Sequence, residues 1–320
     1  MHHILPSDLP AVLNDISAAR LSSYKNFFSP GNDAELYGLY CWNDAISSRY
    51  MRLIGILEIL LRNRIHLNMS YYAWGATSNG TQDSNDWYMK LYRPFTSNST
   101  SDRSLKKKIG DQRAPASASK VIAGMTYGFW PYVLDKTLDI SGAPVPWETL
   151  IPAIAPGHHQ RSSTYWGKLA HQDELFARIM LVGDLRNRVA HFEPLWKFGD
   201  EMSETRDRPN APRTVVTNAP STIDDSLARL HKSYRQTTQL LHWLSKARAA
   251  DYAESENHQA LTWLITKAGL NHFRSLPTYN EVKLGSLTKS WGLKEELKTQ
   301  KFARVTHKRT LIGRYYSAPC

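Results

Sequence analysis

Cysteine is almost missing from this chain of 320 residues, which contains only Cys41 and Cys320. Two cysteines are too few for a disulfide framework or for a cysteine-rich zinc site. The longest apolar run, at residues 53–61, contains Glu58 and is too short to cross a bilayer. The N-terminus lacks the basic and then apolar pattern of a signal peptide. These absences predict a protein of a reducing compartment, most simply the cytoplasm, that does not bind membranes.

The alternation of apolar and polar residues that marks a half-buried β-strand is nearly absent, whereas helical spacing of apolar residues is found through most of the chain. The sequence therefore predicts an all-α fold. We expect helices over residues 6–24, 33–74, 173–192, 223–252 and 258–268. The middle of the second helix is apolar on most faces, which is typical of a buried helix.

Changes in composition divide the chain into segments. Residues from about 77 to 118 are rich in Ser, Asn, Thr, Gly and Lys, which predicts a loop-rich insertion with one short element near 87–91. Residues from about 197 to 221 are polar and contain proline, which predicts a linker or a mobile loop. We assign residues 1–255 to one helical domain and residues 256–320 to a basic C-terminal extension.

The net charge of +11 is unevenly distributed. The last forty residues contain nine Lys and Arg against three Glu, a net charge of +6, together with four aromatic residues. Cations interleaved with aromatic side chains are typical of surfaces that hold single-stranded nucleic acid. The candidate contacts there are Lys301, Arg304, Lys308, Arg309 and Arg314. The alternatives are a solvated tail that improves solubility, and aromatic side chains that dock onto the core.

A helix that ends before Pro194 contains the residues best suited to chemistry. Asp184, Asn187 and His191 form one polar line on it, and Arg186 flanks that line. Histidine exchanges protons near neutral pH, and arginine presents a charged fork that suits phosphate. No cluster with metal-ligand spacing is present, so we expect no metal and no cofactor. Metal-free chemistry on a phosphodiester favours RNA, whose 2′-hydroxyl is a built-in nucleophile. The alternative is that these residues are solvated or complement the helix dipole.

The stretch Arg186-Asn187-Arg188-Val189-Ala190-His191, followed by Pro194, resembles the R-x4-6-H motif of the HEPN superfamily, and more specifically that of the Abi-like (abortive infection) family. Residues 57–63 are similar to the buried early helix of that family. Residues 125–130 are similar to its aromatic-Gly-aromatic segment, with Tyr127 where Phe is more usual. The similarity covers roughly residues 36–251.

The resemblance implies a HEPN-like helical bundle that acts as a metal-independent endoribonuclease in bacterial phage defence or as a toxin. It also implies an active site shared across a homodimer, and it allows for an antitoxin made of protein or RNA. Arg186 would be the transition-state cation, His191 the proton carrier and Asn187 an orienting or ligand-binding residue. Arg188 would be a phosphate contact. The alternative is a non-catalytic helical module that binds RNA or a partner protein.

The early helix has a polar line of its own, formed by Glu58, Arg62 and His66 at intervals of four residues. Charged side chains on an otherwise apolar helix are costly unless they are paired or functional. One interpretation is an ion pair that stabilises the helix. The other is that these residues, like Asp184, support the cleft that contains Arg186 and His191.

Overall fold

The computed structural model describes residues 4–75, 79–112, 117–276, 302–307 and 310–316. Helices dominate these residues, as the all-α prediction requires, and the strands form two small antiparallel pairs. One pair joins β1 (Glu201–Met202) to β2 (Val215–Thr217), and the other joins β3 (Phe302–His307) to β4 (Thr310–Tyr316). No helix among the described residues is both long enough and apolar enough to cross a membrane.

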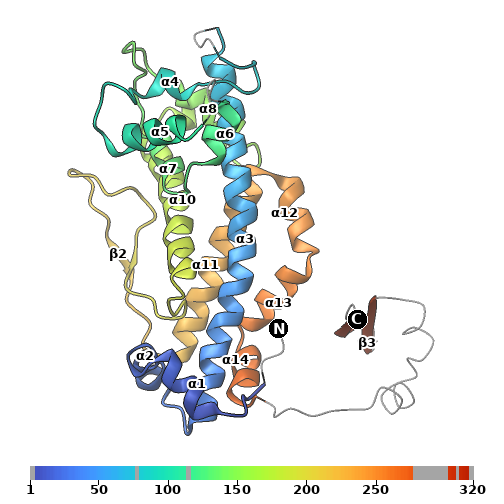
Figure 1. The fold of residues 1–320 in the computed structure, drawn as a ribbon. Helices are drawn as coiled ribbons and strands as arrows, with labels where there is room; N and C mark the ends of the chain where they lie inside the picture. Colours follow the sequence, from blue (N-terminus) through green and yellow to red (C-terminus); the bar gives the residue numbers. More distant parts are fainter. Residues whose placement is uncertain (1–3, 76–78, 113–116, 277–301, 308–309, 317–320) are drawn as a thin grey trace.

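Helix α3 (Asp33–Ala73) is the axis of the molecule (Figure 1). Its 41 residues extend for about 60 Å at 1.5 Å per residue. The side chain of Asn32 caps its first turn by accepting the Glu35 amide at 2.9 Å. Seven of its apolar side chains are completely buried: Leu39, Ile46, Leu53, Leu57, Leu61, Ile65 and Met69. The near-uniform apolar character seen in the sequence thus reflects neighbours packed along the whole helix.

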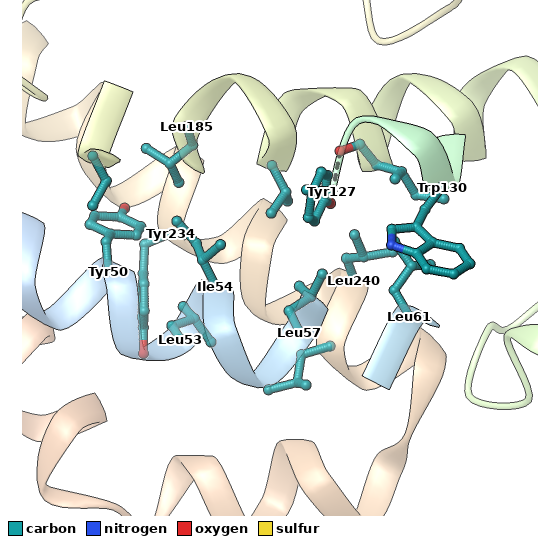
Figure 2. Packing of buried hydrophobic residues seen from close by; sticks show 14 of the residues in the cluster. Tyr50, Leu53, Ile54, Leu57, Leu61, Tyr127, Trp130, Leu185, Tyr234 and Leu240 are labelled. Carbon is teal, nitrogen blue, oxygen red and sulfur yellow. Dashed lines mark hydrogen bonds between the residues drawn. The ribbon is translucent and has the colours of Figure 1, made fainter. Parts of the chain in front are cut away.

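Helices from both halves of the chain pack against α3. Among them are α2 (Ala18–Phe28), α8 (Trp147–Ile154), α10 (Leu169–Ala190), α11 (Ile223–Leu244), α13 (Glu256–Leu264) and α14 (Lys267–Arg274). Figure 2 shows the centre of this packing, where Leu57 of α3 and Leu240 of α11 lie near Tyr127. The hydroxyl of Tyr127 donates to the Ile179 carbonyl of α10 at 3.0 Å, so the ring joins these helices without leaving its polar atom unpaired.

Two of the expected helices are each interrupted at a serine. The predicted helix 6–24 is α1 (Leu9–Ile16) followed by α2, with Ser17 between them at a φ of 82°. The predicted helix 223–252 ends at Leu244, and α12 (Lys246–Ala253) begins after Ser245. In both cases the serine side chain accepts an amide of the following helix, which favours a new helix start over continuation. The prediction of continuous helices was therefore wrong at these two points.

The helical body continues past the expected boundary at residue 255. Trp42 of α3 donates its indole N–H to the Leu264 carbonyl at 2.8 Å, and Glu35 pairs with Arg274 at 2.8 Å. A Cβ on Gly38 would lie 1.8 Å from the Phe273 carbonyl oxygen, so α14 crosses α3 at a point that only glycine allows. Residues up to Leu276, whose side chain is buried, therefore belong to the body.

The insertion at 77–118 contains more structure than its composition predicts. The expected short element is α4 (Tyr88–Leu91). A second helix, α5 (Thr100–Gly110), covers the Lys-rich stretch, and α6 (Ala118–Ala123) begins at the end of the insertion. The last short helix before α8 is α7 (Phe129–Val133), and α9 (Ser163–Trp166) follows α8.

The C-terminal candidates for nucleic-acid binding are only partly described. Arg304 lies on β3 opposite Arg314 on β4 in the antiparallel register. Lys301, Lys308 and Arg309 lie outside the described residues. A strand pair at this place was not expected from the sequence.

Candidate functional site

The motif lies at the C-terminal end of α10. The helix ends at Ala190, and His191 is its C-cap, with its amide bonded to the Asn187 carbonyl at 3.0 Å. Phe192 then adopts a left-handed φ of 53°, which turns the chain away from the helix before Pro194. The side chains of Asn187 and His191 are exposed and that of Arg186 is half-buried. Within the described part of the chain, none of these three side chains has a hydrogen bond or an ion pair, so all three are available to a ligand.

Arg188 has a different position from the other motif residues. Its guanidinium donates to the carbonyls of Pro194 and Lys197, the latter at 2.8 Å, and it pairs with Glu193 at 3.6 Å. Burial lowers the pKa of Arg188, although Glu193 opposes this effect. The sequence predicted Arg188 as a phosphate contact. In the structure its N–H donors are used to hold the turn that follows α10.

Side chains from distant parts of the chain fix the same turn. Arg20 of α2 donates to the Phe192 carbonyl at 2.7 Å. The buried amide of Asn43 accepts from the Leu195 amide at 2.7 Å and donates to the Glu193 carbonyl at 3.3 Å. The sequence analysis missed Asn43, although a polar residue on the buried face of an apolar helix is a signal that it must satisfy a partner.

Trp196 completes the anchor of this turn. Its ring is 1% exposed and stacks on Phe27 with 4.8 Å between ring centroids. Phe28 and Tyr24 of α2 contact its edges. Together these contacts place the end of α10 rigidly against α2 and α3.

The motif is divided between two surfaces. A pocket of about 550 Å³ is lined by Asp184 and Arg188, but not by Arg186, Asn187 or His191. Burial raises the pKa of the Asp184 carboxyl, and Arg213 partly offsets this. The polar line expected from the sequence therefore ends at the pocket with Asp184, while the other two members of the line lie outside it.

The roof of the pocket is the segment expected to be a linker. Residues 199–221, here called the strap, contain β1 and β2 and lie along α10 (Figure 1). Five ion pairs join the strap to the body: Glu204 with Arg178 at 2.8 Å, Arg208 with Asp173 at 2.6 Å, Glu201 with Lys232 at 2.6 Å and with Arg229 at 3.4 Å, and Arg206 with Asp135. The segment is therefore tethered along its length.

The three polar residues predicted to form a line on α3, Glu58, Arg62 and His66, do not interact as a group. Glu58 and Arg62 do not pair, and the Arg62 Nε donates to Asn63 at 3.4 Å. Glu58 is half-buried near Tyr127, and its charge adds to burial in raising the pKa of that tyrosine, as does the charge of Asp184. Tyr127 is thus the one described link between this line and α10.

His66 belongs to the insertion and not to the motif. Its Nδ1 accepts the indole N–H of Trp87 at 2.9 Å, so the proton of the neutral ring is on Nε2, 2.9 Å from the Ser84 hydroxyl. Burial and the charge of Arg62 lower the pKa of His66, which favours this neutral form. The histidine therefore fastens the insertion to α3.

Other reactive groups are few. The described residues contain no group of three or more His, Cys, Asp or Glu that is placed to hold a metal ion. Cys41 is buried, and burial raises the pKa of its thiol to about 11. A scan against protein-family models, a search of curated proteins and a search of solved structures each find no match to this chain.

Proposed function

We propose that this protein is an endoribonuclease that cleaves RNA without a metal ion, with Arg186, Asn187 and His191 as its active-site residues. The observation that carries the proposal is the combination of free side chains with a fixed backbone at the end of α10. Exposed His191 and half-buried Arg186 have no partner in the described structure, yet the turn beside them is held by Asn43, Arg20 and Trp196. A site needs both properties, because its groups must be available and their positions must be set in advance.

The reaction follows from what these groups can do. The 2′-hydroxyl of a ribose attacks the adjacent phosphorus, and the bond to the 5′-oxygen of the next nucleotide breaks. A general base takes the proton from the 2′-hydroxyl, and a general acid gives one to the departing 5′-oxygen. The products are a 2′,3′-cyclic phosphate and a 5′-hydroxyl. Arg186 would stabilise the extra negative charge on the phosphorane, and Asn187 would orient the histidine or the ribose.

A second copy of the chain would complete the site, because one copy supplies one motif histidine while the reaction uses a base and an acid. His191 of one protomer would act as the base and the same residue of the other as the acid. The side chain of Phe192, next to His191, is 61% exposed and would be covered by such a partner. The dimer is therefore part of the proposal.

The biological setting rests on the resemblance of the 186–194 stretch to Abi-like HEPN proteins. The substrate would be an RNA of the bacterial cytoplasm, cleaved during phage infection or under the control of an antitoxin made of protein or RNA. Expression of the wild-type chain should then arrest growth, and expression of His191→Ala should not.

The decisive experiment is a cleavage assay in EDTA with the purified chain. We expect cyclic phosphate ends, and a loss of about 10²- to 10⁴-fold in rate for His191→Ala, since one general acid or base contributes that much. Arg186→Ala should be similarly impaired. His242→Ala and Arg235→Ala remove exposed residues of the same types on α11 and are the matched controls. Cleavage that needs a metal, or full activity in both motif variants, would contradict the proposal.

A second candidate function is RNA binding without cleavage. It is favoured by the position of Arg186, Asn187 and His191 outside the pocket of about 550 Å³ beside α10, because sites that catalyse reactions are usually concave. In that case the motif variants would weaken RNA binding, and no RNA would be cleaved by the wild type.

A further inference from the structure

Helix α5 shows two opposite faces. On one face Leu105 is fully buried, Asp102 is 3% exposed, and Ile109 packs against the hydrophobic core. On the other face Arg103, Lys106 and Lys107 are exposed. These three residues lie within about 100° on a helical wheel. We call them the basic face of α5.

No carboxylate neutralises this face. The side chain of Asp102 points inward and accepts from the Arg93 amide at 2.7 Å and from the Ser99 hydroxyl. Asp111 pairs with Lys108, outside the basic face, at 3.8 Å. Arg103, Lys106 and Lys107 have no ion pair in the described structure, and neither has the exposed Lys120 of the neighbouring α6. The positive charge is therefore open to an external anion.

Helix stability does not account for the arrangement. Arg103 lies close to the N-terminus of α5, where the helix dipole disfavours a cation. Arg103 and Lys107 are four residues apart, so their like charges repel each other. Lys107 lies in the last turn, where the dipole favours a cation, so helix stability accounts for one of the three charges. A bound polyanion would account for all three.

An exposed aromatic ring lies in the turn that precedes α5. Phe95 is 59% exposed in the turn that begins at Arg93, where the Thr96 amide bonds to the Arg93 carbonyl at 3.2 Å. The same Arg93 is bonded to Asp102 in the first turn of α5. The turn that contains Phe95 is thus bonded to the helix that presents the cations. Aromatic rings and cations on one surface hold single-stranded nucleic acid by stacking and by phosphate contact, which is the occupant that we take forward.

We propose that the basic face of α5, together with Phe95, binds the backbone and bases of single-stranded RNA at a point distant from the motif. That this RNA is also the substrate rests on the proposed function. The two points lie toward opposite ends of the bundle (Figure 1). Asn43, which holds the motif turn, and His66, which holds the insertion, are about 35 Å apart along α3. Only an RNA long enough to reach both points gains from the second contact.

The test removes the three charges together and measures binding of a fluorescent, unstructured RNA by anisotropy over a range of salt concentrations. For Arg103→Ala/Lys106→Ala/Lys107→Ala we expect at least tenfold weaker binding at moderate salt. The slope of log Kd against log salt should decrease by about 2, since each phosphate contact with a single strand contributes about 0.7. Lys25→Ala/Lys168→Ala/Lys246→Ala is the matched control, because it removes three exposed lysines from other parts of the surface. The control should bind RNA like the wild type.

Phe95→Ala separates stacking from charge. This variant should bind RNA more weakly with an unchanged salt slope. Wild-type affinity in the α5 triple variant, or an equal loss in the control, would overturn the proposal. So would binding of the wild type to anionic lipid vesicles but not to RNA.

The outcome is independent of whether the motif is catalytic. If the wild type cleaves no RNA, the proposed function fails, while anisotropy still decides whether α5 binds RNA. If it does cleave, the α5 triple variant should lose kcat/KM on a long RNA but not on a short one. His191→Ala should bind long RNA normally and lose cleavage of both. Unchanged kcat/KM of the α5 variant on long RNA would overturn the α5 site alone.

Discussion

The chain leaves α10 through two consecutive segments that are held by different forces. Residues 192–198 bury Leu195 and Trp196 and are hydrogen-bonded to Asn43 and Arg20. The strap that follows has no buried side chain, and ion pairs join it to the body. Apolar burial and buried hydrogen bonds resist salt, whereas ion pairs are weakened by salt, although less so where they are partly buried, as Arg178, Asp173 and Glu201 are. The motif end of α10 is therefore held by packing and buried hydrogen bonds, while the roof of the pocket beside it is held by charge.

The largest expected effect is the loss of the aromatic anchor in the first segment. Trp196→Ala should lower the free energy of unfolding by about 3–5 kcal/mol, because it leaves a large cavity among Phe27, Phe28 and Tyr24. Denaturant titration measures this. Val216→Ala, an exposed position in the strap, should change the same quantity by no more than about 0.5 kcal/mol. Equal effects of the two changes would remove the contrast between the segments.

Loss of the polar anchor should have an intermediate effect. Asn43→Ala leaves the Leu195 amide and the Glu193 carbonyl without partners, which should cost about 1–3 kcal/mol of unfolding free energy. Hydrogen exchange at the Leu195 amide should become faster. Asn63→Ala, an exposed asparagine on the same helix, is the control and should leave both quantities nearly unchanged. If hydrogen exchange at the Leu195 amide stays slow in Asn43→Ala, other contacts hold the turn.

The strap should respond to salt without a comparable change in global stability. Raising the ionic strength from 0.1 M to 1 M shortens the Debye length from about 10 Å to about 3 Å, which weakens its ion pairs. Cleavage by trypsin after Arg206 and Arg213 should then accelerate several-fold, after correction for the effect of salt on trypsin with a model peptide. Glu204→Gln should reproduce part of the acceleration at low salt, because it removes the negative charge by which the strap pairs with Arg178. Cleavage that is independent of salt would show that the strap is held by something other than charge.

The smallest effect concerns the pKa of Asp184 beneath the strap. Burial raises this pKa, so opening the strap should return it toward its ordinary value. In Glu204→Gln/Arg208→Ala at constant salt, carbon-detected NMR titration should find a lower pKa for Asp184 than in the wild type. The sign follows because a better-solvated carboxyl ionises at lower pH. An unchanged pKa would mean that the strap does not cause the burial.

The sequence predicted those features that depend on local pattern. The long α3 and the end of α10 before Pro194 were predictable, because apolar periodicity and a helix-breaking proline act over a few residues. The helix α5 was missed because its Ser- and Lys-rich composition is typical of loops, and Leu105 and Ile109 alone give it an apolar side. The breaks at Ser17 and Ser245 were missed because a serine cap fits within a helical pattern.

The candidate site was predictable only in part, for a related reason. Arg186, Asn187 and His191 were placed at one helix end, and the structure leaves their side chains free. Three other side chains hold the turn after α10 by hydrogen bonds to its backbone: Arg188, Asn43 and Arg20. The bonds of Asn43 and Arg20 join residues more than 140 positions apart. No local sequence pattern predicts such bonds. The same holds for His66, whose partners Trp87 and Ser84 come from the insertion.

The central position of α3 also has a consequence for synthesis of the chain. Its apolar side chains are made early, but they are covered by helices that are translated much later, the last of which crosses at Gly38. Contacts between such distant segments slow folding. Until they form, the nascent chain exposes the apolar side chains of α3. A chain truncated before α14 would therefore leave α3 uncovered around Gly38, and such truncated chains should aggregate or be captured by chaperones.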